Sequence, residues 1–209
     1  MNETSNTRWL DWSREIQSIS QIGITFAEND YQLERYQRLM EIAAEIVNEN
    51  TELPVETILE VFRIQPGYAT PKIDVRGAIF KDLKLLMVRE KMDGRWSLPG
   101  GWAEVGEAPA ESVEREVLEE SGFRVKVKKV IGVYDANRWE PMEFFHAYKL
   151  VFLCDIIGGK AATSKETTAV TFFSEDEFPL EFAGERTRMR HIYDAFSAVK
   201  DENFTTVFD

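Results

Sequence analysis

The first third of the chain has the apolar periodicity of α-helices. Between about Trp9 and Asn50 glycine is rare and proline is absent. The clearest stripe, with steps of three and four residues, runs through Leu33, Tyr36, Met40, Ala43 and Val47. A similar stripe precedes it at Trp9, Trp12, Ile16 and Ile19. Asp30 is expected to cap the second helix, and Pro54 suits the first turn of a shorter third helix. Residues 1–65 are therefore predicted to form a small helical domain.

The periodicity changes after residues 66–71, where glycine and two prolines predict a linker. Short apolar and β-branched runs follow at 72–80 and 84–90, and a turn near Asp82 makes them a predicted hairpin. Further strands are expected at 124–135, 146–157 and 169–174, with helices at 109–121 and 185–200. In the last helix Met189, Ile192 and Phe196 are expected to face inward. Residues 72–209 are therefore predicted to form an α+β domain with a mixed sheet and flanking helices.

Composition and charge narrow the class of protein. The chain has 209 residues, of which 44% are hydrophobic, and no apolar run reaches the length of a membrane helix. The start of the sequence lacks the basic and apolar segments of a secretory signal, so a cytoplasmic protein with no membrane partner is expected. A net charge of -12 argues against a nucleic-acid partner. The single cysteine, Cys154, lies in an apolar run typical of a buried strand rather than of a reactive thiol.

Candidate chemistry is concentrated between Trp96 and Phe123. Glu116, Glu119 and Glu120 are spaced so that one helix would carry all three on one side, where they repel one another unless cations compensate. Rigidly held carboxylates are ligands that Mg²⁺ or Mn²⁺ prefers. The turn before this helix contains three glycines that allow close approach of the backbone to a ligand: Gly100, Gly101 and Gly106. Taken alone, the three glutamates also fit a solvated acidic helix.

The full spacing of this stretch resembles the signature of the Nudix hydrolase family. The signature positions are occupied by Gly101, Glu107, Arg115, Glu116, Val117, Glu119, Glu120, Gly122 and Phe123. Seven fixed residue types at these spacings would match by chance in about one sequence in a million. The resemblance implies a Nudix α/β/α sandwich and hydrolysis of a nucleoside diphosphate linked to another group. The N-terminal helices, with the segments 71–80, 85–102 and 130–139, resemble a two-part bacterial subgroup linked to ADP-ribose and CDP-choline hydrolysis.

The same resemblance implies roles for the signature residues. Glu116 and Glu120 would be the principal ligands of Mg²⁺ or Mn²⁺, and the carbonyl of Gly100 often joins them. Glu119 would be a further ligand or the base that activates water. Arg115 and Glu107 would hold the loop and the carboxylates in place. The subgroup resemblance and the apolar helices together imply a homodimer, with the N-terminal domain as a dimerisation element or a cover over the cleft.

The general base is open at this point, because many Nudix enzymes carry an acidic residue before the strand at 169–174. Glu166 is available there, but Ala169 stands where glutamate is common. Glu166 and Glu119 are both candidates, and a surface or capping role for Glu166 is equally compatible with the pattern.

Several cationic and aromatic residues are candidates for substrate recognition. Arg76, Arg89 and Arg95 flank the signature and could meet a phosphate, although surface ion pairs explain them as well. The aromatic candidates for stacking on a base or enclosing a quaternary ammonium are Trp96, Trp102, Tyr134, Trp139 and Phe145. Core packing is the alternative for each of these. His146 and His191 have no metal-binding spacing and are expected to be structural.

A nucleoside diphosphate derivative is thus the expected substrate. Three alternatives are a pyrophosphohydrolase that cuts a nucleoside triphosphate to the monophosphate, a nucleotide-sensing module without catalysis, and an mRNA-decapping enzyme. A sensing module would be expected to have lost signature carboxylates, all of which are present. A decapping enzyme would require a basic RNA path that the sequence lacks.

Overall fold

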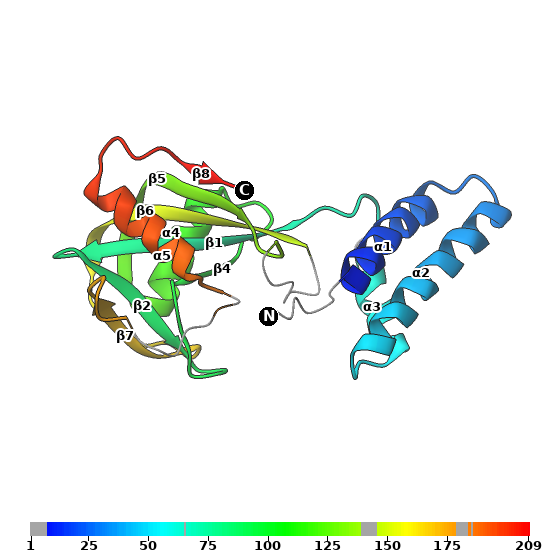
Figure 1. The fold of residues 1–209 in the computed structure, drawn as a ribbon, viewed down its shortest axis with the longest axis horizontal. Coiled ribbons are helices and arrows are strands. Elements are labelled where there is room, and N and C mark those ends of the chain that lie inside the picture. The colour runs from blue at the N-terminus through cyan, green and yellow to red at the C-terminus, as the bar shows by residue number, and fades with distance from the viewer. Residues whose placement is uncertain (1–7, 65, 139–145, 179–183, 185) are drawn as a thin grey trace, which may run out of the picture. The chain divides into compact units, whose positions relative to one another are not determined.

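The computed structural model describes residues 8–64, 66–138, 146–178, 184 and 186–209. The chain divides into two compact units, with the first break between Pro71 and Lys72 (Figure 1). No helix in this described part of the chain is long and apolar enough to cross a membrane.

The N-terminal unit contains three helices in its described residues: α1 (Arg8–Phe26), α2 (Asp30–Asn50) and α3 (Val55–Arg63). The predicted stripe of α2 forms the core of this unit, in which Met40, Ala43, Ala44 and Val47 pack with Ile58 and Phe62. Asn29 caps α2, because its side chain accepts a 2.9 Å hydrogen bond from the N–H of Gln32. The expected cap, Asp30, is instead the first helical residue. A 2.8 Å hydrogen bond from the Ser13 hydroxyl to the Ala43 carbonyl joins α1 to α2.

The second unit carries the remaining elements, two helices and a mixed sheet. The helices are α4 (Pro109–Ser121) and α5 (Met189–Lys200). The strands are β1 (Lys72–Lys81), β2 (Lys84–Glu90), β3 (Trp96–Ser97), β4 (Gly100–Trp102), β5 (Phe123–Asp135), β6 (Ala147–Gly159), β7 (Thr167–Phe173) and β8 (Val207–Phe208). These elements confirm the predicted α+β architecture.

Strand β1 belongs to two sheets that diverge from it. Its C-terminal end pairs with β2 at Phe80↔Leu85, and positive φ angles at Asp82 and Leu83 close the predicted hairpin turn. The other part of β1 pairs with β4 on one side and, in parallel, with β6 on the other. Among the described residues the strand order is β3-β2-β1-β6-β5-β8, with β7 beside β2. The N-terminal half of β1 therefore lies between β4 and β6, whereas its C-terminal end pairs with β2.

Helix α4 packs against β1 at Gly77, where a side chain would prevent close approach. A Cβ atom added to Gly77 would lie 2.6 Å from the Val117 side chain, so glycine permits the contact. Val113 and Val117 are fully buried there with Val75 and Ile79. Burial of each valine contributes roughly 2 kcal/mol to stability. This packing holds α4 against the sheet.

Helix α5 covers the other hydrophobic core of this unit (Figure 1). Ile192 and Phe196 are buried there against Ala78, Leu153 and the neighbouring strands, as predicted. The expectation for Met189 is wrong, since this residue begins the helix and is 38% exposed.

Candidate active site

The loop and helix that carry the signature adopt the predicted local structure. Pro109 begins α4, and the carboxylate of Glu111 accepts a 2.9 Å hydrogen bond from the N–H of Ala108, which would otherwise be unsatisfied at the helix start. Gly122 ends the helix in the left-handed conformation with φ 76°. The glutamates in between are therefore held on a rigid element.

The three signature glutamates differ in exposure. Glu120 is 5% exposed, and its carboxylate accepts a 2.9 Å hydrogen bond from the N–H of Gly100. The Glu116 side chain is largely buried, whereas that of Glu119 is 60% exposed. The helix thus directs two carboxylates toward the glycine turn and leaves the third near solvent.

Two glycines make room for this arrangement. Gly100 has φ 144°, and a Cβ atom there would lie 2.0 Å from the Val75 carbonyl oxygen. A Cβ atom on Gly101 would lie 3.1 Å from the Glu116 carboxylate. Gly100 is thus required by the backbone, and Gly101 leaves space that the Glu116 carboxylate uses.

Arg115 fastens the loop to the helix. Its guanidinium donates hydrogen bonds of 2.8 and 3.1 Å to the two oxygens of Glu107, which also accepts a 2.6 Å bond from the Ser112 hydroxyl. The hydrogen bond from Arg115 lowers the pKa of Glu107. Arg115 also donates to Glu116 at 2.9 Å and to Glu119 at 3.4 Å. This is the geometry expected of residues that hold the loop and the carboxylates in position.

The electrostatics of this site favour a bound cation. Burial, with repulsion from Glu90 and Glu116, raises the pKa of Glu120 to about 7. Burial and the neighbouring Glu119 also raise the pKa of Glu116. Among the described residues no three acidic, histidine or cysteine side chains already converge as a metal cage, and Arg115 lies against two of the three glutamates. The carboxylate oxygens and their mutual repulsion nevertheless fit a hard divalent ion, which would replace the contacts of Arg115 with Glu116 and Glu119.

Glu166 lies in the turn before β7, and its side chain is mostly exposed. Its backbone carbonyl accepts a 2.8 Å hydrogen bond from the N–H of Lys91, and its carboxylate pairs with Lys165 at 3.7 Å. The next residue, Thr167, donates a 2.8 Å hydrogen bond to the Glu120 carbonyl. This turn is therefore fastened to the C-terminal end of α4.

The candidate recognition residues lie in different environments. Arg76 is buried and donates two 2.8 Å hydrogen bonds to Asp74, so a surface ion pair does not explain it. Arg89 is exposed and donates to the Gly94 carbonyl at 2.6 Å. Trp96 packs edge-on against Phe173 with ring centroids 4.9 Å apart, as core packing predicts. Trp102 is 43% exposed. Trp139 and Phe145 lie outside the described residues.

Sequence reasoning missed a buried polar network behind Gly100. Asp74 links Arg76 to Lys149, whose Nζ lies 3.6 Å from the Asp74 carboxylate. Burial alone would lower the pKa of Arg76, but Asp74 raises it, and Glu120 and Glu90 add to this effect. Glu90 in turn accepts a 2.8 Å hydrogen bond from the Ser97 hydroxyl. The signal for this network in the sequence was the pair of charged residues, Asp74 and Arg76, at alternate positions of the otherwise apolar strand β1.

Comparison with known proteins identifies the family to which the chain belongs. Residues 71–196 match the NUDIX domain family, and residues 7–62 match a family described as a UDP-X-like, N-terminal oligomerisation domain. The chain therefore belongs to the Nudix hydrolases, enzymes that hydrolyse pyrophosphate bonds in nucleoside diphosphates linked to another group and generally use divalent metal ions.

Individual relatives extend the similarity over both units. The chain is 36% identical over 204 residues to the Bacillus subtilis protein named "Putative ADP-ribose pyrophosphatase YjhB", covering 97% of this chain and 98% of the relative. A crystal structure of a UDP-X diphosphatase matches 96% of this chain and 98% of its own, with 29% identity and a TM-score of 0.62. An ADP-ribose pyrophosphatase structure from Streptococcus suis matches 67% of this chain and 100% of its own, with 36% identity and a TM-score of 0.62.

Proposed function

We propose that this chain hydrolyses the pyrophosphate bond of a nucleoside diphosphate linked to a second group, with ADP-ribose and CDP-choline as the leading substrates. The observation that carries this proposal is the pair of buried carboxylates, Glu116 and Glu120, set against the glycine turn. The names of the relatives that match both units support a diphosphate-linked substrate. Water attacks one phosphorus, and the bond from that phosphorus to the bridging oxygen breaks, so each product carries a phosphate.

We assign the Mg²⁺ or Mn²⁺ ligands to Glu116, Glu120 and the Gly100 carbonyl. When bound, such an ion neutralises the diphosphate charge and lowers the pKa of the attacking water. Arg115 and Glu107 keep the loop in register with the helix, which positions the carboxylates before substrate arrives.

Glu119 and Glu166 are the proposed candidates for the base. Glu119 lies on the signature helix, and its carboxylate accepts a 3.4 Å hydrogen bond from Arg115. Glu166 lies on the turn that Thr167 fastens to the helix. Glu119→Gln and Glu166→Gln, compared by their kcat profiles against pH, separate the two, because loss of the base removes the acidic limb of the profile.

A substrate panel tests the reaction. Purified full-length protein is incubated with Mg²⁺ or Mn²⁺ and ADP-ribose, CDP-choline, UDP-sugars or nucleoside triphosphates, and the products are identified. Nucleoside monophosphate plus a second phosphorylated compound is expected, whereas monophosphate plus pyrophosphate from triphosphates alone would support the nucleotide-pool alternative. Glu120→Gln is expected to lower kcat by about 10²- to 10³-fold. Turnover that needs neither metal nor Glu120 would contradict the proposal.

We also propose that residues 1–65 form a homodimerisation domain. Trp9 and Ile16 face the core of this unit, but Trp12, Ile19 and Phe26 recur every seven residues along α1 and are each at least half exposed. An exposed stripe of large apolar residues is typical of an interface. The match to an N-terminal oligomerisation family supports this assignment.

Mass measurement in solution tests the dimer. The full chain is expected at twice the 24.1 kDa of one chain, and Ile19→Glu is expected to shift it to the monomer. Glu34→Gln changes an exposed residue of α2, outside this stripe, and serves as the control. A monomeric wild-type chain, or an Ile19→Glu variant of unchanged mass, would reject the assignment.

A further inference from the structure

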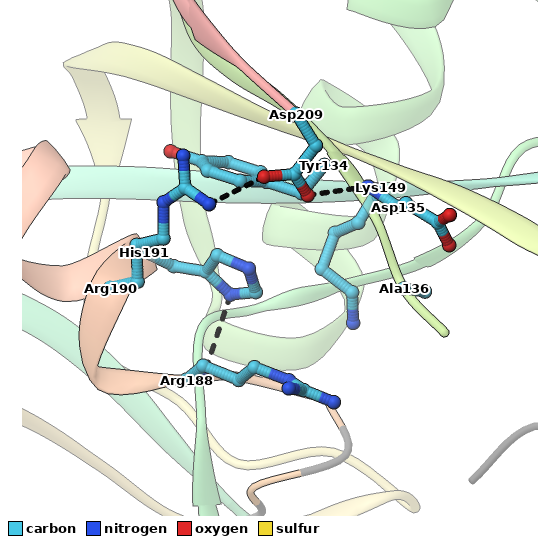
Figure 2. Close-up of a pocket in the computed structure, with 8 residues that line it drawn as sticks. All are labelled: Tyr134, Asp135, Ala136, Lys149, Arg188, Arg190, His191 and Asp209. Atoms are coloured by element: carbon cyan, nitrogen blue, oxygen red, sulfur yellow. Dashed lines mark hydrogen bonds and ion pairs between the residues drawn. The ribbon is translucent and has the colours of Figure 1, made fainter. Parts of the chain in front are cut away.

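A second candidate site lies on the α5 side of the sheet, away from the signature helix. It is a pocket of about 140 Å³ between the ends of β5 and β6 and the start of α5 (Figure 2). The side chains that define it include Tyr134, Lys149, Arg188, Arg190, His191 and Asp209. A water needs about 10–15 Å³ of cavity, so this space holds roughly ten non-hydrogen atoms, the size of one heterocyclic base.

The walls of this pocket are planar. The ring centroids of Tyr134 and His191 are 4.5 Å apart, and the Arg190 guanidinium lies 5.3 Å from the centre of the Tyr134 ring. Burial, with repulsion from Lys149 and Arg188, lowers the pKa of His191 to about 3, so its ring is neutral at physiological pH. Tyr134 and His191 are almost wholly buried and form the floor of the pocket, whereas the Arg190 side chain is 41% exposed and its planar guanidinium is a group on which a heterocycle can stack.

The polar groups around these rings include both donors and acceptors. Lys149 and Arg188 extend toward the space below the His191 ring, and Asp135 and Asp209 lie on the opposite side (Figure 2). Lys149 also donates a 2.6 Å hydrogen bond to the Arg186 carbonyl. Mixed donors and acceptors match the edge of a nucleobase.

Strand register connects this pocket to the proposed catalytic turn. Gly100 pairs with Arg76, Asp74 pairs with both Trp102 and Lys149, and Lys149 pairs with Tyr134. Lys149 is therefore two strands and two residues from Gly100, which places their Cα atoms about 12 Å apart. The buried ion pairs of Asp74 with Arg76 and Lys149 lie along this path. A ribose and one phosphate are enough to span such a distance.

We propose that this pocket binds the nucleobase of the diphosphate substrate, while the pyrophosphate lies at the glycine turn. The inference rests on the proposed function for the identity of the substrate. It assigns base recognition to β5, β6 and α5.

Binding of isolated halves of the substrate tests the assignment without catalysis. Adenosine, cytidine, uridine and ribose 5-phosphate are titrated into the full-length protein by calorimetry. Arg188→Gln and Arg190→Gln are each expected to raise the nucleoside Kd by about tenfold, the loss of one charged hydrogen bond or cation contact. Neither variant is expected to change the Kd of ribose 5-phosphate. Lys200→Gln removes a cation from the same helix outside the pocket and is the control.

A second measurement does not depend on any pocket variant. The chain has two histidines, so the imidazole NMR spectrum contains one signal for His191 and one for His146, assigned with His146→Gln. Nucleoside binding is expected to shift the His191 signal through the ring current of the base. No His191 shift, nucleoside affinities unchanged in both arginine variants, or a loss of ribose 5-phosphate affinity instead would each overturn the assignment. Failure of the proposed function would appear separately, as absence of hydrolysis of every diphosphate.

Discussion

The carboxylate of Glu120 accepts a 2.9 Å hydrogen bond from the backbone N–H of Gly100 and is 5% exposed. This contact joins the C-terminal half of the signature helix to the strand that begins at the glycine turn. It also places a carboxylate that is difficult to ionise beside a backbone that a divalent ion can approach.

Metal binding is expected to stabilise the protein through Glu120. At a concentration of 100 times its Kd, Mg²⁺ or Mn²⁺ should raise the free energy of unfolding by about 2.7 kcal/mol. Glu120→Gln should lose most of this increase, because the variant retains size but not charge. Thermal unfolding with the metal and with EDTA measures the effect, and Glu202→Gln is an exposed control. An equal increase in wild type and Glu120→Gln would show that the ion binds elsewhere.

Replacement of the two adjacent glycines should separate stability from activity. Gly100→Ala places a Cβ atom 2.0 Å from the Val75 carbonyl oxygen, so we expect a loss of at least about 3 kcal/mol in stability. Gly101→Ala meets only the Glu116 carboxylate at 3.1 Å, so we expect a folded protein in which Glu116 is displaced. Urea unfolding and kcat are measured for both. A Gly101→Ala variant with full activity would argue against a role for the Glu116 position.

A lysine at position 115 should not be able to replace the two hydrogen bonds that the Arg115 guanidinium donates to Glu107. Arg115→Lys keeps the cation but loses the paired geometry, so kcat is expected to fall by about tenfold or more. Stability should change by less than about 1 kcal/mol, because the pair is partly exposed. A double-mutant cycle with Glu107→Gln gives the coupling. Independent effects of the two changes on kcat would contradict joint positioning.

Acid should destabilise the folded chain through His191. The unfolded chain binds a proton there near pH 6.5, whereas the folded pKa is about 3, so stability is complete above pH 6.5 and falls toward pH 3. Between pH 7 and pH 5 this group contributes a decrease of about 2 kcal/mol. His191→Asn should lower stability at pH 7 but flatten this decrease, while His146→Asn should retain it. Urea unfolding at several pH values measures the slope, and equal slopes for wild type and His191→Asn would contradict the prediction.

Local sequence patterns predicted most elements of the fold. The steps of three and four residues in α2, and the proline and glycine that bound α4, depend on neighbours in the chain and were recovered. The cap of α2 and the exposure of Met189 were not, because helix ends depend on which neighbouring residue adopts the capping conformation. The surface alternative for Arg76 was wrong because Asp74, two residues away on the same strand, supplies its buried partner.

The sequence by itself determined the reaction class, because the signature residues lie within one loop and one helix and their spacing sets their geometry. It also placed Glu116, Glu119 and Glu120 on one side of that helix. Only the tertiary structure decided that Glu120 is buried against Gly100 while Glu119 is exposed. The pocket of Tyr134, Lys149 and His191 likewise required the fold, since its residues come from β5, β6 and α5. Contacts between residues so distant in the chain depend on strand register and helix packing, which no local pattern specifies.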